Sequence, residues 1–218
     1  MLDKQRAETE QSMGVEKKSL TCKVYEQVYA AVVNAQLNCN DIITEAKIAE
    51  QMQVSKAPVR EALLMLCQEN VLQAIPRTGY LVTHISPAQV GNLVEARILL
   101  ETNMLQMGWS KIGPDQVREM HELHYSLHSD AESSTILDRW KSNTEFHIKL
   151  AGYCGNEYLI QALRQMLRTS ARAATQCFLG YREAGHEASY HEEILEALTI
   201  PSFEKARDAL ICDIREIM

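Results

Sequence analysis

Two basic side chains, Lys56 and Arg60, follow Ser55 closely, and their types and spacing suit contact with a nucleic acid. Serine is favoured just before a helix, because its hydroxyl can accept from the unpaired N–H groups of the first turn. Pro58 is tolerated in that turn, where its missing N–H costs nothing. The first residues of such a helix can enter the major groove of DNA. We therefore predict a DNA-reading surface formed by Ser55, Lys56, Ala57 and Arg60.

The elements that must position these side chains can be read from the apolar pattern around them. Residues at positions i, i+3, i+4 and i+7 make one apolar face of the helix after Ser55. These residues are Val59, Ala62, Leu63 and Leu66. Upstream, Thr44 can cap a short helix that carries Ile48 and Met52. Two short helices joined by a turn predict a helix-turn-helix.

A β-hairpin, or wing, is predicted after the second helix. Residues 71–75 and 80–82 are short β-prone runs, and Pro76-Arg77-Thr78-Gly79 separates them. Gly79 supplies the positive φ that such turns require. Upstream, helical spacing of apolar residues predicts a first helix from Thr21 to Gln36, and Asn38-Cys39-Asn40-Asp41 reads as a turn.

This half of the chain resembles the N-terminal domain of GntR-family transcription regulators. The resemblance rests on Ile48-Ala49-Glu50, on the run from Val54 to Leu63 and on Pro76-Arg77-Thr78-Gly79-Tyr80. It implies that Lys56 and Arg60 lie in the major groove and that the wing tip, Arg77, Thr78 and Gly79, approaches the minor groove or the backbone. The sequence departs from the family at Lys56, which stands in place of Arg, and at Ala57, which stands in place of Thr. Lysine lacks the bidentate fork of arginine, so base readout is expected to differ here.

Composition and charge agree with an ordinary globular chain. It has 218 residues, 46% of them hydrophobic, and a net charge of −7. The charge is uneven, because residues 17–84 hold seven Lys or Arg against six Asp or Glu. This modest positive balance favours a dimer, which doubles the phosphate contacts. No apolar run reaches membrane-spanning length and residues 1–18 do not look like a signal peptide, so a cytoplasmic protein is expected.

The remaining chain is predicted to be helical. Residues 1–19 read as a flexible tail, 20–84 as the winged helix-turn-helix and 85–218 as a helical domain. Breaks at Gly113-Pro114, Gly155-Asn156 and Pro201-Ser202, with Gly180 and Gly185, divide the second domain. Six helices are expected, at about 87–110, 114–131, 134–154, 156–181, 186–199 and 202–217. The fold class is thus mostly α, a winged helix-turn-helix plus a six-helix antiparallel bundle.

The helical half resembles the effector domain of the FadR-like branch of the GntR family, the all-helical FCD type. The matching segments are Glu95–Glu101, Asn143–His147 with Gly155-Asn156, and His191–Leu198. The resemblance implies a domain for effector binding and dimerisation. In this branch a divalent metal, held by one Asp and three His, helps to bind a small organic acid. Ligand binding then changes how the dimer presents its two recognition helices.

Carried over residue by residue, the implied metal site is altered. Its four positions are Asn143, His147, His191 and Asp213. Asn143 replaces the family's Asp and Asp213 replaces its last His. Imidazole, carboxylate and amide oxygen can all bind a metal such as zinc or nickel. The alternative is a polar bundle core in which the four side chains bond to one another without metal.

Arginines in the helical half indicate the ligand class. A buried guanidinium needs an anionic partner, and Arg97 matches a family position near the effector pocket. Arg97 and Arg168 are therefore candidates for binding a small carboxylate. The alternative for Arg97 is an exposed pair with Glu101 at i+4. Surface placement stays open for Arg164, Arg168 and Arg172.

Other reactive side chains point less clearly to a site. His121, His124 and His128 form a helical stripe that could bind metal but suits a solvated face better. Six cysteines lack the paired spacing of a zinc or disulfide framework, and thiol sensing by Cys154, Cys177 and Cys212 is a further alternative. No pattern supplies a nucleophile and base, so no enzyme is expected.

Together these features predict a homodimeric DNA-binding transcription regulator, a repressor, that binds a double-stranded operator. A small carboxylate in the helical domain is expected to modulate binding, with or without metal. The alternative is a dimeric regulator whose helical domain serves only dimerisation or thiol sensing.

Overall fold

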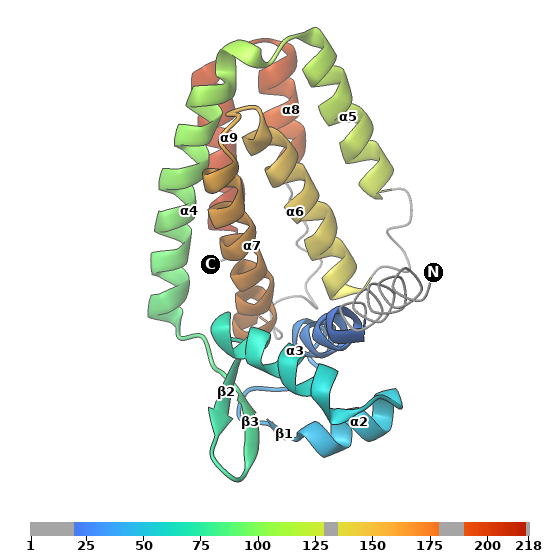
Figure 1. Ribbon diagram of the computed structural model, residues 1–218. Coiled ribbons are helices and arrows are strands. Elements are labelled where there is room, and N and C mark those ends of the chain that lie inside the picture. The colour runs from blue at the N-terminus through green and yellow to red at the C-terminus, as the bar shows by residue number, and fades with distance from the viewer. Residues whose placement is uncertain (1–19, 129–134, 179–189, 217–218) are drawn as a thin grey trace, which may run out of the picture. The chain divides into compact units, whose positions relative to one another are not determined.

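Two compact units, Met1–His84 and Ile85–Met218, make up the chain. The structure, a computed structural model, describes residues 20–128, 135–178 and 190–216 (Figure 1). Within these residues, no helix is both long and apolar enough to cross a membrane.

The first unit contains the predicted helix-turn-helix and wing. A helix over residues 20–33 precedes β1 (Ile42–Ile43), α2 (Glu45–Met52), α3 (Lys56–Gln68), β2 (Leu72–Ile75) and β3 (Gly79–Val82). The first helix ends at residue 33 rather than at Gln36. The reason is a left-handed Ala35, with φ of 57°, which turns the chain so that the N–H of Gln36 donates to Ala31 O at 2.8 Å.

The two central helices begin where the capping pattern predicts. Thr44 caps α2 by accepting from the backbone N–H of Lys47 at 3.3 Å. Ser55 occupies the N-cap position of α3 with an extended backbone, but its side chain makes no capping hydrogen bond. The predicted start of α3 is therefore confirmed, and the predicted capping by the Ser55 hydroxyl is wrong.

A third strand, absent from the sequence analysis, completes the wing sheet. β1 pairs antiparallel with β3, so the strand order is β1-β3-β2. Tyr80 on the central strand faces Ile43 on one side and Ala74 on the other. Gly79 has a φ of 144°, and a Cβ there would collide with the carbonyl oxygen of Ile43. Glycine is thus needed both for the turn and for the approach of β1.

The second unit consists, in its described residues, of the six predicted helices. They are α4 (Pro87–Gly108), α5 (Pro114–His128), α6 (Ile136–Gly152), α7 (Glu157–Phe178), α8 (His191–Thr199) and α9 (Phe203–Arg215). A short 3₁₀ turn, η1 (Trp109–Lys111), follows α4. Parts of five of the expected helices, at 114–131, 134–154, 156–181, 186–199 and 202–217, lie outside the described residues.

Packing in the second unit brings residues distant in sequence together. α7 packs against both α4 and α6, while α9 packs against α4 and α8 (Figure 1). Ser86 fixes the start of α4 through a capping box with Gln89. Apolar residues such as Phe146, Ile194 and Leu210 form the core. This core surrounds an unusual set of buried polar side chains from α4, α6, α8 and α9.

Replacing Gly79 by alanine tests the wing geometry. Gly79→Ala should destabilise the protein by about 1–3 kcal/mol, because its φ and the nearby Ile43 oxygen both disfavour a Cβ. Gly91→Ala is the control, since a Cβ at Gly91 in α4 would meet nothing within 4 Å, and it should stabilise slightly. Urea unfolding followed by circular dichroism measures both. Equal urea midpoints for the two variants would contradict the requirement for glycine at position 79.

Candidate functional site

The N-terminal end of α3 presents the predicted DNA-reading residues to solvent. Ser55, Lys56, Ala57 and Arg60 are all exposed, whereas Pro58 and the apolar face behind it are buried. The structure therefore brings the four side chains onto one accessible surface, with a basic residue in the first turn and another one turn later.

The wing tip is equally accessible. Arg77 and Thr78 are exposed, and Thr78 closes the turn by donating its N–H to Ile75 O at 3.1 Å. Arg77 itself adopts a φ of 63°. The sequence predicted a positive φ at Gly79 alone, whereas the turn contains two residues with positive φ, Arg77 and Gly79.

A carboxylate that the sequence analysis missed lies against the recognition surface. Glu45, at the start of α2, forms an ion pair with Arg60, with Nε and Oε1 2.9 Å apart. The Arg60 side chain nonetheless keeps 63% of its surface exposed. The exposed part of the guanidinium is thus available to a ligand.

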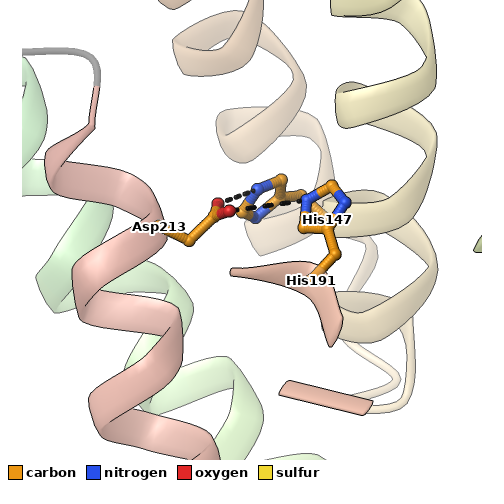
Figure 2. A group of neighbouring side chains, drawn as sticks. All are labelled: His147, His191 and Asp213. Carbon is orange, nitrogen blue, oxygen red and sulfur yellow. Dashed lines mark ion pairs between the residues drawn. The ribbon is translucent and has the colours of Figure 1, made fainter. Parts of the chain in front are cut away.

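A separate polar centre lies inside the helical unit, around His147 on α6. His147 is 1% exposed, and its Nδ1 donates to Glu101 Oε2, on α4, at 2.6 Å. On the other side of the ring, Nε2 lies 2.8 Å from Asp213 Oδ2 on α9, with the oxygen off the direction of the ring N–H. Figure 2 shows His147, His191 and Asp213 pointing toward one another from three helices.

His191 and Asn143 complete the set of four predicted ligands. His191 Nε2, at the start of α8, lies 3.7 Å from Asp213 Oδ1. The Asn143 amide lies 3.5 Å from the same nitrogen, and its Oδ1 is buried without a hydrogen-bond partner among the described residues. The ring of Phe146 stacks on His191 at a centroid distance of 3.8 Å. The four positions therefore converge on one point inside the helical unit.

Arg97 extends this centre toward α7. It is 2% exposed, and its Nε donates to Glu101 Oε1 at 2.8 Å. Nη1 lies 3.4 Å from the Ser170 hydroxyl, while Nη2 has no hydrogen-bond partner in the described part of the chain. The pair with Glu101 at i+4 thus exists, but it is buried rather than exposed. A buried guanidinium nitrogen without an acceptor suits an anionic ligand.

Family comparisons cover most of the chain. Residues 20–82 match the bacterial regulatory proteins of the gntR family, and residues 92–216 match the FCD domain. The chain belongs to the GntR family. It is a transcription regulator of the branch with an FCD domain; regulators of this family bind DNA operators and generally act as dimers, and they are not enzymes.

Individual relatives are distant GntR regulators. An uncharacterized HTH-type regulator of Streptomyces ambofaciens is 27% identical over 201 residues, which cover 89% of this chain and 81% of that protein. The repressor GlaR of Escherichia coli is 28% identical over 120 residues, 53% of this chain and 54% of that protein. The match to Bacillus subtilis YdhC, at 23% identity and 65% of this chain, spans only 64% of that relative.

A solved GntR structure shares the fold. E. coli McbR/YncC superposes with a TM-score of 0.74 at 21% identity, covering 90% of this chain and 94% of that one. The predicted fold class, a mostly α chain with a winged helix-turn-helix and a helical bundle, is therefore confirmed.

The four GntR ligand positions fit a divalent cation despite their altered residue types. One donor atom from each of His147, His191 and Asp213 lies within 4.8 Å of the other two. Donors around a tetrahedral zinc with bonds of about 2.0–2.2 Å lie about 3.3–3.6 Å apart. A half-turn of the Asn143 amide about its Cβ–Cγ bond exchanges the positions of Oδ1 and Nδ2, so Asn143 can present Oδ1 as a fourth donor. Glu101 would orient His147 from its outer nitrogen, as carboxylates commonly do for metal-binding histidines.

Without a bound cation, the two carboxylates beside the ring favour a protonated His147. Burial alone would lower the pKa of His147, but Glu101 and Asp213 outweigh it and raise that pKa to about 9. Burial likewise opposes ionisation of Glu101, but Arg97 and His147 together lower its pKa. An imidazolium between two carboxylates, with Arg97 beside them, leaves the centre neutral. The structure therefore accommodates either a metal ion or a protonated His147.

The other candidate arginines are divided between core and surface. Arg164 is exposed and Arg168 half-buried, whereas Arg172 is buried. Surface placement is thus right for Arg164 and wrong for Arg172, which lies in a stretch of α7, from Ser170 to Thr175, in which every residue is buried.

The histidine stripe is only partly a solvated face. His124 is buried, and its ring meets those of Phe146 and His191 edge-on. The prediction that the stripe faces solvent is therefore wrong for His124. His121 Nε2 contacts the Thr199 hydroxyl at 3.1 Å. The side chain of His128 lies outside the described residues. Of the thiols, Cys154 is buried and Cys212 exposed, while the Cys177 side chain also lies outside the description.

Glu101 is the main residue of the helical centre that sequence reasoning undervalued. The i, i+4 spacing from Arg97 was visible, but a pair at that spacing is usually exposed. A usable signal lay in the flanking residues, since Val94, Met104 and Leu105 place both charged groups on the apolar face of α4.

The stability of metal-free protein should depend on pH through His147. Because its folded pKa exceeds the unfolded value, protonated His147 stabilises the fold below about pH 6.5, and this contribution is lost as pH rises through about 9. Burial and nearby carboxylates raise the pKa of Glu216 to about 7. Its ionisation therefore destabilises the fold increasingly as pH rises from about 4.5 to about 7, which is below the range in which His147 loses its proton.

Thermal melting of chelator-treated protein between about pH 7 and pH 9 should therefore show a falling transition temperature. Glu101→Gln should flatten the fall, because it removes one of the two carboxylates that hold the proton. His121→Gln is the control and should keep the fall. A transition temperature that stays constant or rises over this range would contradict the proposed ionisation.

Proposed function

We propose that this GntR regulator is a homodimeric repressor that binds operator DNA through α3 and the wing, and that a small organic acid bound in the helical unit beside a divalent cation controls that binding. The proposal rests chiefly on one observation. A buried cationic nitrogen, Arg97 Nη2, lacks an acceptor in the described residues of the same unit in which His147, His191 and Asp213 converge.

The chemistry of this centre favours a carboxylate. Arg97 offers an N–H donor with a full positive charge, and Glu101 fixes its orientation through Nε. A cation held by the imidazoles and Asp213 would supply a second positive group, which carboxylate oxygens bind well. Asn143, His147, His191 and Asp213 are the residues that would hold it. Asn143 replaces the family's Asp and Asp213 replaces its last His, so the four positions still hold a single carboxylate. A divalent cation bound there would keep a net positive charge, which favours an anionic ligand nearby.

Control of DNA binding follows from linkage. A ligand shifts an equilibrium only by binding one state better than the other. The centre joins α4, α6, α8 and α9, so a ligand that moves any of these helices changes the helical unit as a whole. Repression is proposed because several relatives, GlaR among them, are named repressors. A ligand that releases DNA must prefer the state that cannot bind the operator.

One observation favours a second candidate function. Arg97, Glu101, His147 and Asp213 can balance their charges with a proton alone, so the centre can close without metal. The helical unit would then serve only dimerisation. Metal content separates the two candidates.

Elemental analysis of protein purified without chelator should find one zinc or nickel per chain. His147→Ala should lose that metal, because it removes a ligand at the centre of the site. His121→Ala, which removes a histidine outside the site, should keep it. Circular dichroism checks that both variants remain folded. Metal-free wild-type protein, or undiminished metal in His147→Ala, would contradict the metal proposal and favour the dimerisation role.

Operator binding should depend on Arg60. With a duplex selected from a random-sequence pool by the full-length protein, Arg60→Ala should bind about tenfold or more weakly, as loss of a bidentate base contact would cost. Arg118→Ala, on exposed α5, is the charge-matched control and should bind normally. Fluorescence anisotropy measures both. Normal binding by Arg60→Ala would show that α3 does not read the operator.

A further inference from the structure

Arg60 is held by a built arrangement of three elements. Its Nε donates to Glu45 Oε1 and its Nη2 to Glu45 Oε2, each at 2.9 Å. The Tyr80 hydroxyl donates to Glu45 Oε1 at 3.1 Å. Glu45 belongs to the first turn of α2, Arg60 to α3 and Tyr80 to the central strand of the sheet. The guanidinium is thereby tied to both halves of the helix-turn-helix and to the wing.

The position of Glu45 is unexpected for a DNA-binding surface. A carboxylate beside the recognition helix repels phosphate and offsets the charge of Arg60. Hydrogen bonds from Arg60 lower the pKa of Glu45, with burial opposing, so it stays ionised at neutral pH. By charge alone, Glu45 should therefore weaken DNA binding, which suggests that it also has a second effect that favours binding.

The geometry of the pair supplies that role. Glu45 occupies the edge of the guanidinium formed by Nε and Nη2. The opposite edge, Nη1 with the second hydrogen of Nη2, is left for a ligand, and 63% of the side chain remains exposed. That edge can donate two parallel hydrogen bonds to guanine O6 and N7 or to a phosphate. Holding an arginine in place before binding also reduces the entropy lost when it is fixed on DNA.

Neighbouring residues make this orientation more important. Lys56 carries a point charge and Ala57 no polar side chain, so neither offers a directional fork. Of the four predicted reading residues at the start of α3, Arg60 alone carries a planar fork that fixes the direction of two hydrogen bonds. Tyr80, buried and paired in register with Ile43 and Ala74, provides a rigid support for Glu45.

We propose that Glu45, supported by Tyr80, is a positioning residue that orients Arg60 for end-on contact with operator DNA and so sets sequence specificity. This rests on the proposed DNA-reading role of α3. Glu45 touches no DNA itself. Its negative charge weakens the attraction of the surface to phosphate, which lowers the affinity for DNA of arbitrary sequence. Its hydrogen bonds hold the Arg60 guanidinium in one orientation, which raises the affinity for the operator.

The test compares two neutralising variants on the same helix. Glu45→Gln and the control Glu50→Gln, which is exposed on α2, each remove one negative charge. Affinities of full-length protein are measured for the selected duplex and for a scrambled duplex of equal length. Glu50→Gln should bind both slightly better. Glu45→Gln should bind the selected duplex about 3- to 10-fold more weakly and the scrambled one no more weakly, reducing the specificity ratio.

Two further variants separate positioning from a merely structural role. In an Arg60→Ala background, Glu45→Gln should cause no additional loss, because it acts through Arg60. Tyr80→Phe should reduce the specificity ratio about two- to threefold, since it removes one of the three hydrogen bonds to Glu45 without changing charge. Equal losses in both Arg60 backgrounds would overturn the proposal, as would a Glu45→Gln ratio equal to that of Glu50→Gln. If Arg60→Ala itself binds normally, the DNA-reading role of α3 fails instead.

Discussion

A histidine buried between two carboxylates is the interaction on which the helical unit depends. Carboxylates and a guanidinium are costly to remove from water unless each is paired. Here Glu101 pairs with Arg97 on one side and His147 on the other, and Asp213 closes the far side of the ring. The balance holds only if His147 is protonated or a cation lies beside it. α4, α6 and α9 are thereby joined through one charged group. A proton or cation bound at this centre therefore changes the interactions of all three helices.

In both units of this GntR regulator a carboxylate pairs with the arginine that we propose as a ligand-binding group. Glu101 holds Arg97 through Nε and leaves Nη2 without a partner in the described residues. Glu45 holds Arg60 through Nε and Nη2 and leaves the opposite edge exposed. The environments differ, because Arg97 is buried and Arg60 lies on the surface. A buried guanidinium selects for an anion that can enter the bundle, whereas an exposed one selects by direction on a large polyanion.

Local patterns predicted the elements well but not the contacts between them. The run from Val54 to Leu63 and the Gly79 turn indicated α3 and the wing, because capping, periodicity and turn chemistry act over a few residues. β1 was missed since its two residues become a strand only by pairing with β3. Glu101 and Glu45 were undervalued for a related reason: their partners His147 and Arg60 lie 46 and 15 residues away. His124 was expected in solvent, and only the packing of α5 against α6 and α8 buries it.

X-ray absorption at the metal edge of the zinc-loaded protein would show directly which side chains hold the cation. We expect a first shell of nitrogen and oxygen only, at about 2.0–2.2 Å, with the outer-shell scattering of two imidazole rings. A sulfur neighbour at about 2.3 Å would place the metal on a cysteine instead. Either that result, or failure of the protein to hold zinc at all, would contradict the assignment of His147, His191, Asp213 and Asn143 as a cation site.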